Sequence, residues 1–548
     1  MLELIFFSIL SVIIVTPLGY IFTKHNNNNI VNLSNDLIYG LILISFITLL
    51  LNFFFALNII VNSLILLLPL LIFFKNLKIY YSLNFLKFVI FNSIVVFLLI
   101  AKSNIYRPDA ILYHLPYTGI LNNEKIIFGL SNLHFRFAHI SIIQYFSAFF
   151  NNFIFGSKGV TLSIAIIASA IIINFFAHLL YYLKHRKFNF HFFYLFSILI
   201  FVAYKMNRYG EYGNDAPTHF LFFFLISEII ISFNNIKTYF NANHFILAVF
   251  IVLNKITMAF AIFLPFIFLK KNELFKVFIK PKSYFAFIFL FLWVLKNLIV
   301  SGCAIYPISK LCFQNLEWTN IHQTMNVSQE NEAWTKAWPD FKNTNNITQT
   351  EYSKNFNWVR TWSRTHLKKI NEILIPYLIL LIFIYSSIYF RFKEKKTIQD
   401  NINNKKYLFL VILMIIFSII WFLKVPVYRY GYSYFVSFLS LSFAYLCTLN
   451  IHLKKKSYKF FIPVLILFTI GFISKNLLRI VKPDNYYTHF FPKIIYTDKS
   501  DINKIELNEF IYYESVKMCG YSYAPCTHYL NQKLKSKKYY NYNVILTY

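Results

Sequence analysis

The chain has 548 residues, of which 58% are hydrophobic and only 14% are charged, whereas a soluble protein usually carries about 25% charged residues. This composition excludes ordinary globular domains and indicates a polytopic membrane protein. The net charge of +31 does not point to a nucleic-acid partner, because the basic residues stand in short runs between apolar stretches, where they set the orientation of a membrane chain.

The apolar stretches predict an all-α fold with about 12 to 14 transmembrane or re-entrant helices, since a helix needs about 20 apolar residues to cross the hydrocarbon. They lie near residues 2–23, 36–57, 58–74, 88–101, 139–183, 190–206, 216–233, 283–300, 373–390, 407–423, 432–449 and 460–478. The first stretch lacks the basic start and small-residue exit of a cleaved signal peptide, so we expect it to remain as a span.

Basic clusters between the spans predict the orientation. They lie at Lys75–Lys87, Lys184–Lys187, Lys270–Lys282, Arg391–Lys406 and Lys454–Lys459. If all five clusters face the cytoplasm, as the positive-inside rule requires, the segments on the outer side are 102–135, 207–215, 301–372, 424–431 and 479–548.

This assignment of inner and outer segments requires that 244–269 makes no net crossing of the membrane and that 139–183 makes one. Lys255 interrupts the first of these segments, and Asn151, Asn152 and Gly156 interrupt the second. We therefore expect broken or re-entrant helices there, which a membrane tolerates where protein or water covers the backbone.

Five regions follow from these boundaries. They are N-terminal transmembrane helices (1–84), a membrane core with outer acidic loops (85–300), a large periplasmic loop (301–372), C-terminal transmembrane helices (373–478) and a small periplasmic tail (479–548). Four of the five cysteines lie in the predicted outer segments, as the pairs Cys303 with Cys312 and Cys519 with Cys526. Disulfides persist outside an inner membrane, and the spacing does not match that of structural zinc sites, although free thiols stay an alternative.

The first outer loop holds the densest group of polar candidates. Asp109 follows a span and opens a predicted helix over 110–121, which places Tyr113 on the same face and His114 on an adjoining one. Arg107, His134 and Arg136 belong to the same loop. Asp109 can be a functional carboxylate near the membrane surface, or only a helix cap with Arg107 as its solvated neighbour.

A second acidic patch contains Glu211 and Asp215, and it lies at the outer end of another pair of spans. Asp215 can therefore meet Asp109 on the same face of the membrane, although an ion pair with Arg208 that closes a turn is the alternative. Arg364 and Arg429 lie in the outer segments and can hold a phosphate or extend toward lipid phosphates. The tryptophans of the large loop can stack on sugars or anchor the loop at the headgroups.

Several activities lack their sequence motifs. The chain has no G-x-x-x-x-G-K-[ST] and no G-x-G-x-x-G, and it has neither H-E-x-x-H nor G-x-S-x-G. Nucleotide-driven transport, zinc proteolysis and hydrolase-elbow chemistry are therefore unsupported.

At these residues the chain resembles the GT-C superfamily of integral-membrane glycosyltransferases. The resemblance rests on Arg107-Pro108-Asp109 with Tyr113-His114-Leu115-Pro116, on Gly213-Asn214-Asp215-Ala216-Pro217, and on Leu253-Asn254-Lys255-Ile256-Thr257. The chain also resembles uncharacterised bacterial polytopic envelope proteins through Gly129–Phe137, Ser301-Gly302 and the tail around Cys519 and Cys526.

The resemblance implies that Asp109 is the catalytic base and that Asp215 is a second acidic group of the catalytic site, which orients the acceptor or shares a divalent metal. Arg429, Arg364 and Lys255 would stabilise a lipid phosphate as it leaves. The implied partners are a polyprenyl-phosphate-linked sugar and membrane lipids, in a bacterial inner membrane. Metal use varies in the superfamily, so a divalent metal is left open. The alternatives are a transporter or flippase of lipid-linked glycans, a polymerase or ligase of surface polysaccharide, and a membrane protein without enzymatic activity.

Overall fold

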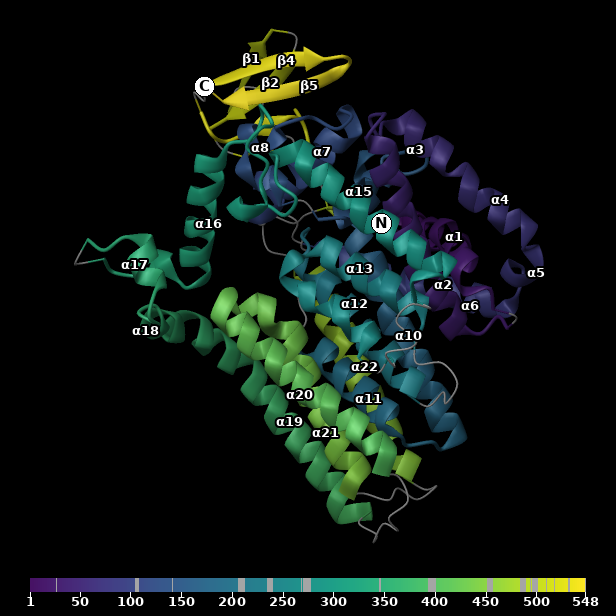
Figure 1. Ribbon diagram of the computed structural model, residues 1–548. Coiled ribbons are helices and arrows are strands. Elements are labelled where there is room, and N and C mark those ends of the chain that lie inside the picture. Colours follow the sequence, from purple (N-terminus) through teal and green to yellow (C-terminus); the bar gives the residue numbers. More distant parts are fainter. Residues whose placement is uncertain are drawn as a thin grey trace.

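Figure 1 shows the computed structural model, a long bundle of helices with a small β-structure at one end. It describes residues 1–548 except 26, 104–107, 140, 206–211, 234–239, 268, 270–276, 344–345, 393–400, 451–456, 483–488, 493, 495–500, 509, 517, 531–532 and 548, and it describes only the backbone of 401–404 and 450.

Ten helices among the described residues are long and apolar enough to cross a membrane. They are α1 (Leu2–Thr23), α2 (Ile30–Asn52), α6 (Leu83–Ile100), α10 (Ser163–His185), α12 (Asp215–Phe233), α15 (Pro281–Ser301), α19 (Lys368–Phe392), α20 (Asn401–Lys424), α21 (Tyr432–Asn450) and α22 (Tyr458–Val481). Shorter helices lie between them: α3 (Ile59–Ile65), α4 (Leu67–Lys75), α5 (Leu77–Tyr80), α7 (Leu115–Asn123), α8 (Leu130–Leu133), α9 (Ile143–Phe149), α11 (Phe190–Tyr204) and α13 (Ala242–Asn254). The fold is that of a multi-pass helical membrane protein.

Asparagine side chains start many of these helices. The side-chain oxygens of Asn29, Asn58, Asn189 and Asn241 accept hydrogen bonds from backbone N–H groups in the first turns of α2, α3, α11 and α13. An asparagine at this position satisfies a backbone donor that the helix itself leaves unpaired. The asparagines between the apolar stretches therefore set helix boundaries.

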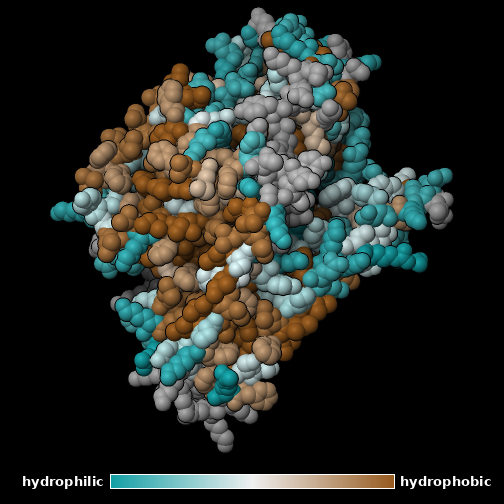
Figure 2. Space-filling model, turned by 180° about the vertical axis from the view of Figure 1, so that it is seen from behind, coloured by the Kyte–Doolittle hydropathy of each residue, from teal (hydrophilic) through white to brown (hydrophobic). Residues whose placement is uncertain are grey.

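Many side chains on the outside of the bundle are apolar. Leu71 of α4, Phe383 of α19 and Leu467 of α22 are each about two thirds exposed, at 66%, 68% and 65%. In Figure 2, brown hydrophobic residues cover the middle of this face, and teal hydrophilic residues gather toward its ends and on the protruding arm. Such a surface is stable against lipid and would be costly in water.

Helices α1 and α2 cross at very short range. A Cβ atom on Gly19 would overlap the backbone oxygen of Asp36, and one on Gly40 would overlap that of Val15. Small residues at such crossings allow helix backbones in a membrane to approach closely. The Asp36 carboxylate, which is fully buried, accepts hydrogen bonds from Thr23 and contacts the His25 ring, so that the same crossing is also fixed by polar contacts.

Two helices are broken where the sequence predicts it. Helix α13 ends at Asn254, Lys255 is extended (φ −151°, ψ 109°), and a 3₁₀ segment follows over Ile256–Phe266. Helix α9 ends before Asn151 and Asn152, and α10 starts only after a 3₁₀ segment over Ser157–Leu162. Whether either segment is re-entrant stays a prediction.

The large loop forms a helical arm that projects to one side in Figure 1. It comprises α16 (Ile321–Thr335), α17 (Gln349–Ser353) and α18 (Val359–Trp362). Disulfides join Cys303 to Cys312 at the base of the arm and Cys519 to Cys526 in the tail.

The tail corrects the all-α prediction. It forms β1 (Ile502–Leu507), β2 (Phe510–Ser515), β3 (Cys526–Thr527), β4 (Leu534–Tyr539) and β5 (Tyr542–Thr547), in a three-stranded sheet of order β1-β2-β3 and a hairpin of β4 with β5. A sequence such as Leu534-Lys-Ser-Lys-Lys-Tyr539 alternates buried and exposed side chains only in part, which a test for span-length apolar runs does not detect.

The tail packs against the segment between α6 and α9. Phe128 exchanges backbone hydrogen bonds with Asn543 and Ile545 of β5, at 3.0 and 2.9 Å. The Gly520 N–H donates to the Ile111 carbonyl at 3.2 Å, and the Trp318 ring of the large loop lies 5.0 Å from the Phe128 ring. Three segments that are far apart in the sequence therefore cover one end of the helix bundle.

Candidate functional site

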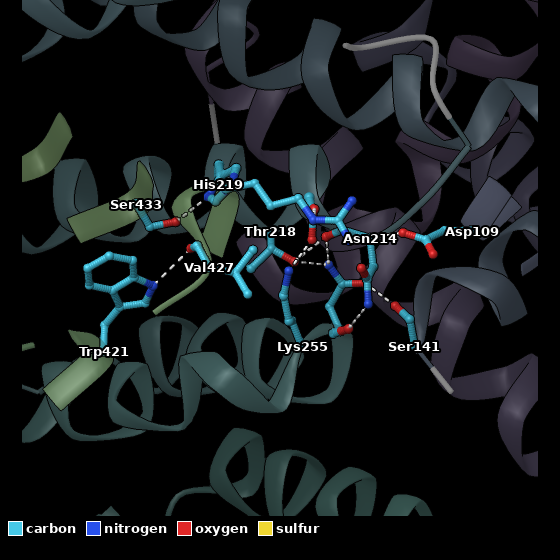
Figure 3. Close-up of polar contacts among 12 residues, drawn as sticks. Asp109, Ser141, Asn214, Thr218, His219, Lys255, Trp421, Val427 and Ser433 are labelled. Carbon is cyan, nitrogen blue, oxygen red and sulfur yellow. Dashed lines mark hydrogen bonds and ion pairs between the residues drawn. The ribbon is translucent and has the colours of Figure 1, made fainter. Parts of the chain in front are cut away.

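One guanidinium joins the two aspartates that the sequence singles out. Arg429 Nη2 lies 3.0 Å from Asp109 Oδ2, and Arg429 Nε lies 3.3 Å from Asp215 Oδ2. Asp109 lies between α6 and α7, Asp215 starts α12, and Arg429 lies in the short turn Tyr428–Gly431 before α21. Residues separated by 320 positions thus form one polar cluster, part of which is drawn in Figure 3.

Two further cations complete the cluster. Lys255 forms an ion pair with Asp215 Oδ1, and Arg136 Nη1 lies 3.3 Å from Asp109 Oδ1. The Lys255 side chain is only 7% exposed, whereas Arg136 is 35% exposed and the two carboxylates are 31% and 28% exposed. Lys255 therefore forms the floor of the cluster, and Arg136 lies nearest its opening.

The helix break places Lys255. Because α13 ends at Asn254 and Lys255 is extended, the Lys255 Nζ reaches Asp215 and lies 3.4 Å from the centre of the Tyr430 ring. Asn254 donates to the Thr218 hydroxyl and to the Asn214 carbonyl, and its own side-chain oxygen accepts from Ser141 (Figure 3). These bonds satisfy the backbone and side chains at the break, where an unpaired polar group would be costly.

The turn that carries Arg429 is held on both sides. The Trp421 indole donates to the Val427 carbonyl at 3.1 Å, and the Trp362 indole donates to the Pro426 carbonyl. His219 of α12 lies 2.6 Å from the Ser433 hydroxyl at the start of α21 (Figure 3). Arg429 is thereby fixed relative to the helix that carries Asp215.

Asp109 is not a helix cap. Its carboxylate makes no capping hydrogen bond, and its two oxygens instead face Arg136 and Arg429. The predicted helix after it begins with a π-helical turn over Ala110–His114 and continues as α7. The Arg136 guanidinium lies 5.1 Å from the Tyr113 ring centre, so Asp109 and Tyr113 contact the same arginine.

Neighbouring charges keep Asp109 ionised. Burial raises the pKa of this carboxyl, but the charges of Arg429 and Arg136 outweigh it and hold the pKa below its ordinary value of 3.8. His114 is buried beside it and contacts Gln144 at 2.9 Å. Burial lowers the pKa of His114 to about 4, so this ring is neutral at pH 7 and adds no charge to the cluster.

The lowered pKa of Asp109 has a consequence for stability. A carboxyl with a depressed folded-state pKa stabilises the protein above its unfolded pKa of about 3.9, and this contribution disappears as the pH falls through the folded value. The melting temperature of wild-type protein in detergent should exceed that of Asp109→Asn at pH 6, and the two should converge below pH 4. A difference that stays constant from pH 6 to pH 3 would show that the charge of Asp109 plays no part.

Two of the remaining predicted residues, His134 and Arg364, belong to the described part of the chain and lie outside this cluster. His134 Nε2 is 3.1 Å from His528 Nδ1 of the tail, and His134 Nδ1 accepts a hydrogen bond from the Arg136 backbone N–H at 3.1 Å. No ion pair joins Arg364 to the cluster among the described residues, and Arg364 lies in a π-helical turn before α19. Arg107 and Glu211, like Arg208, lie outside the described residues.

Sequence reasoning missed the residues that support the charges. These residues carry no charge and belong to no motif; they are Ser141, Gln144, Thr218 and Tyr430. The sequence could have indicated only Tyr430, because it is next to Arg429. No group of three His, Cys, Asp or Glu side chains that could hold a metal occurs in the described part of the chain. Both carboxylates of the cluster face cations instead.

Fold and site together define the class: a multi-pass helical membrane protein with a charged cluster at one end of its bundle. Residues 1–436 match the family described as a domain of unknown function (DUF8201), and the chain belongs to that family. The matched part includes every member of the charged cluster, whereas the β-structured tail lies beyond it. Neither a curated protein nor a solved structure matches the chain.

Proposed function

We propose that the protein is a GT-C-like glycosyltransferase that moves a sugar from a polyprenyl-phosphate donor to a cell-envelope acceptor. In this proposal the cluster faces the periplasm and the protein lies in a bacterial inner membrane. The observation that carries the proposal is the convergence of Asp109 and Asp215 on Arg429, with Lys255 and Arg136 beside them.

The charge balance of the cluster suits a phosphate ligand. Three cations face two carboxylates, so the site keeps one positive charge. A lipid phosphate that leaves the sugar gains negative charge as its bond to the anomeric carbon breaks, and fixed cations stabilise that charge most where water is scarce. Arg429 can also hold a phosphate through two parallel donors.

Asp109 takes the role of the base. The acceptor oxygen attacks the anomeric carbon, the phosphate leaves with the electron pair of the broken bond, and the acceptor proton passes to Asp109. A carboxylate with a lowered pKa is a weak base. Binding of the phosphate to Arg429 weakens the pairing of that arginine with Asp109, however, and this raises the pKa of the carboxyl when the proton arrives. Asp215 holds Arg429 and Lys255 in place.

The decisive experiment compares surface glycan in host cells that express wild-type protein, Asp109→Asn or Asp215→Asn. Each amide keeps the shape of the side chain and removes its charge, so we expect a loss of glycan of at least about 100-fold at equal expression. Asp340→Asn, which changes an exposed carboxylate of the large loop, serves as the matched control. Normal glycan in both cluster variants would reject the catalytic assignment.

Transport of a lipid-linked glycan is the second candidate, because two groups of polar side chains lie inside the bundle. His191 contacts the Tyr182 hydroxyl at 2.9 Å and the Ser227 hydroxyl at 2.7 Å, and His244 lies 3.7 Å from Glu228. Ionisable groups at membrane depth often belong to transport paths. Loss of glycan in Glu228→Gln together with normal glycan in Asp109→Asn would favour transport over transfer.

A further inference from the structure

A groove lies between α10 and α22, two helices that both pack against α11 and α6 but make little contact with each other. It has a volume of about 610 Å³. Its walls are mainly apolar side chains and include Phe176, Leu180 and Leu183 of α10 and Ile462, Ile466 and Ile470 of α22.

The groove has the length of one lipid leaflet. On α10 it runs from Phe176 to Arg186, and on α22 from Tyr458 to Ile470, which at 1.5 Å per residue corresponds to about 15 and 18 Å. The hydrocarbon core of a bilayer is about 30 Å thick. The groove therefore accommodates chains from one side of the membrane only.

One end of the groove is basic. Lys184 and Arg186 line it there, and the Arg186 guanidinium lies 5.2 Å from the Tyr458 ring centre. No ion pair joins either residue to a carboxylate among the described residues. Two positive charges at the mouth of an apolar groove complement a lipid with a negative headgroup.

The basic end lies far from the charged cluster. Ile164, near the start of α10, packs with Ala110 beside Asp109, whereas Lys184 and Arg186 lie at the other end of this 23-residue helix. The helix is about 34 Å long, so groove and cluster belong to opposite leaflets.

We propose that this groove binds an anionic glycerophospholipid of the leaflet opposite the charged cluster. Its acyl chains lie along α10 and α22, and its phosphate meets Lys184 and Arg186. The bound lipid fills the space that separates two helices of the bundle. This inference does not depend on the proposed glycosyltransferase activity, because no residue of the groove belongs to the cluster.

Native mass spectrometry of the protein in mild detergent tests the proposal, with phosphatidylglycerol and phosphatidylethanolamine of identical acyl chains as probes. One basic residue near a membrane surface contributes about 1 kcal/mol toward an anionic lipid, so two of them correspond to a preference of about 30-fold for phosphatidylglycerol. The double variant Lys184→Gln/Arg186→Gln should lose this preference. The matched pair Lys75→Gln/Lys78→Gln, which changes two exposed lysines elsewhere, should retain it.

A second variant tests the groove without altering its charge. Ile466→Trp fills the apolar space and should reduce the binding of both lipids while the preference between them persists. Equal binding of both lipids by the wild-type protein, or an equal effect of the two glutamine pairs, would overturn the proposal. Displacement of phosphatidylglycerol by an equimolar polyprenyl phosphate would also overturn it, because the occupant would then be a substrate lipid.

Discussion

Replacing Arg429 with lysine should reduce surface glycan in host cells by at least about 100-fold while the protein still folds. Arg429 bridges Asp109 and Asp215 through two different nitrogens of one planar group. A lysine ammonium keeps the charge but is a single point, which cannot occupy both positions. Geometry, rather than charge alone, is therefore what this substitution removes.

Arg429→Gln removes the charge as well and separates the two contributions. In this variant Asp109 retains Arg136 as a partner and Asp215 retains Lys255. The two carboxylates are also partly exposed. We therefore expect the free energy of unfolding to fall by about 2 kcal/mol, which is less than the cost of leaving a fully buried charge without a partner. Thermal unfolding in detergent measures this loss of stability. Lysine and glutamine variants that both make normal amounts of glycan would exclude Arg429 from the chemistry.

Gly19→Ala should be the most damaging small substitution in the membrane region. The added methyl would overlap the backbone oxygen of Asp36, and α2 cannot rotate away because the Asp36 side chain is held by Thr23 and His25. Forcing apart a well-packed crossing costs about 1 to 3 kcal/mol. We expect a lower melting temperature in detergent and reduced yield of folded protein.

Gly471→Ala is the matched control for this substitution. Gly471 lies in α22, and a Cβ atom there meets nothing within 4 Å. Because alanine favours the helix over glycine by about 1 kcal/mol in an open position, this variant should melt at or above the wild-type temperature. Equal destabilisation by both substitutions would mean that the α1 and α2 crossing is not specifically tight.

The sequence predicts the parts of the fold that depend on local physics. Span-length apolar runs identify the long helices. Polar residues inside such runs locate the breaks at Asn151 and Lys255, because the backbone groups of an interrupted helix need polar partners where the membrane supplies no water. The division of predicted span 58–74 into α3 and α4 shows the limit of the method. Both pieces are apolar, so a test of hydropathy cannot separate them.

The candidate site was predictable by residue type but not by pairing. Scarce acidic residues beside predicted spans single out Asp109 and Asp215, but nothing in the chain states that Arg429 joins them. That contact depends on the packing of α12 against α21 and on the hydrogen bond between His219 and Ser433. The tail escaped prediction because its strands are short and are stabilised partly by the loop on which they lie.

The docking of the tail sets the order in which this end of the molecule can be assembled. The side chain of Asn132 donates to the carbonyl of Ile545, across 413 positions of sequence, and Phe128 pairs with the same strand. Ribosomes add about 5 to 20 residues per second, so the first loop waits about 20 to 80 s for its partner strand. During that interval the loop that follows Asp109 lacks its contacts with β5. A nascent chain that stalls before β5 would contain all the charged residues of the cluster, but its loop would have no strand to pair with.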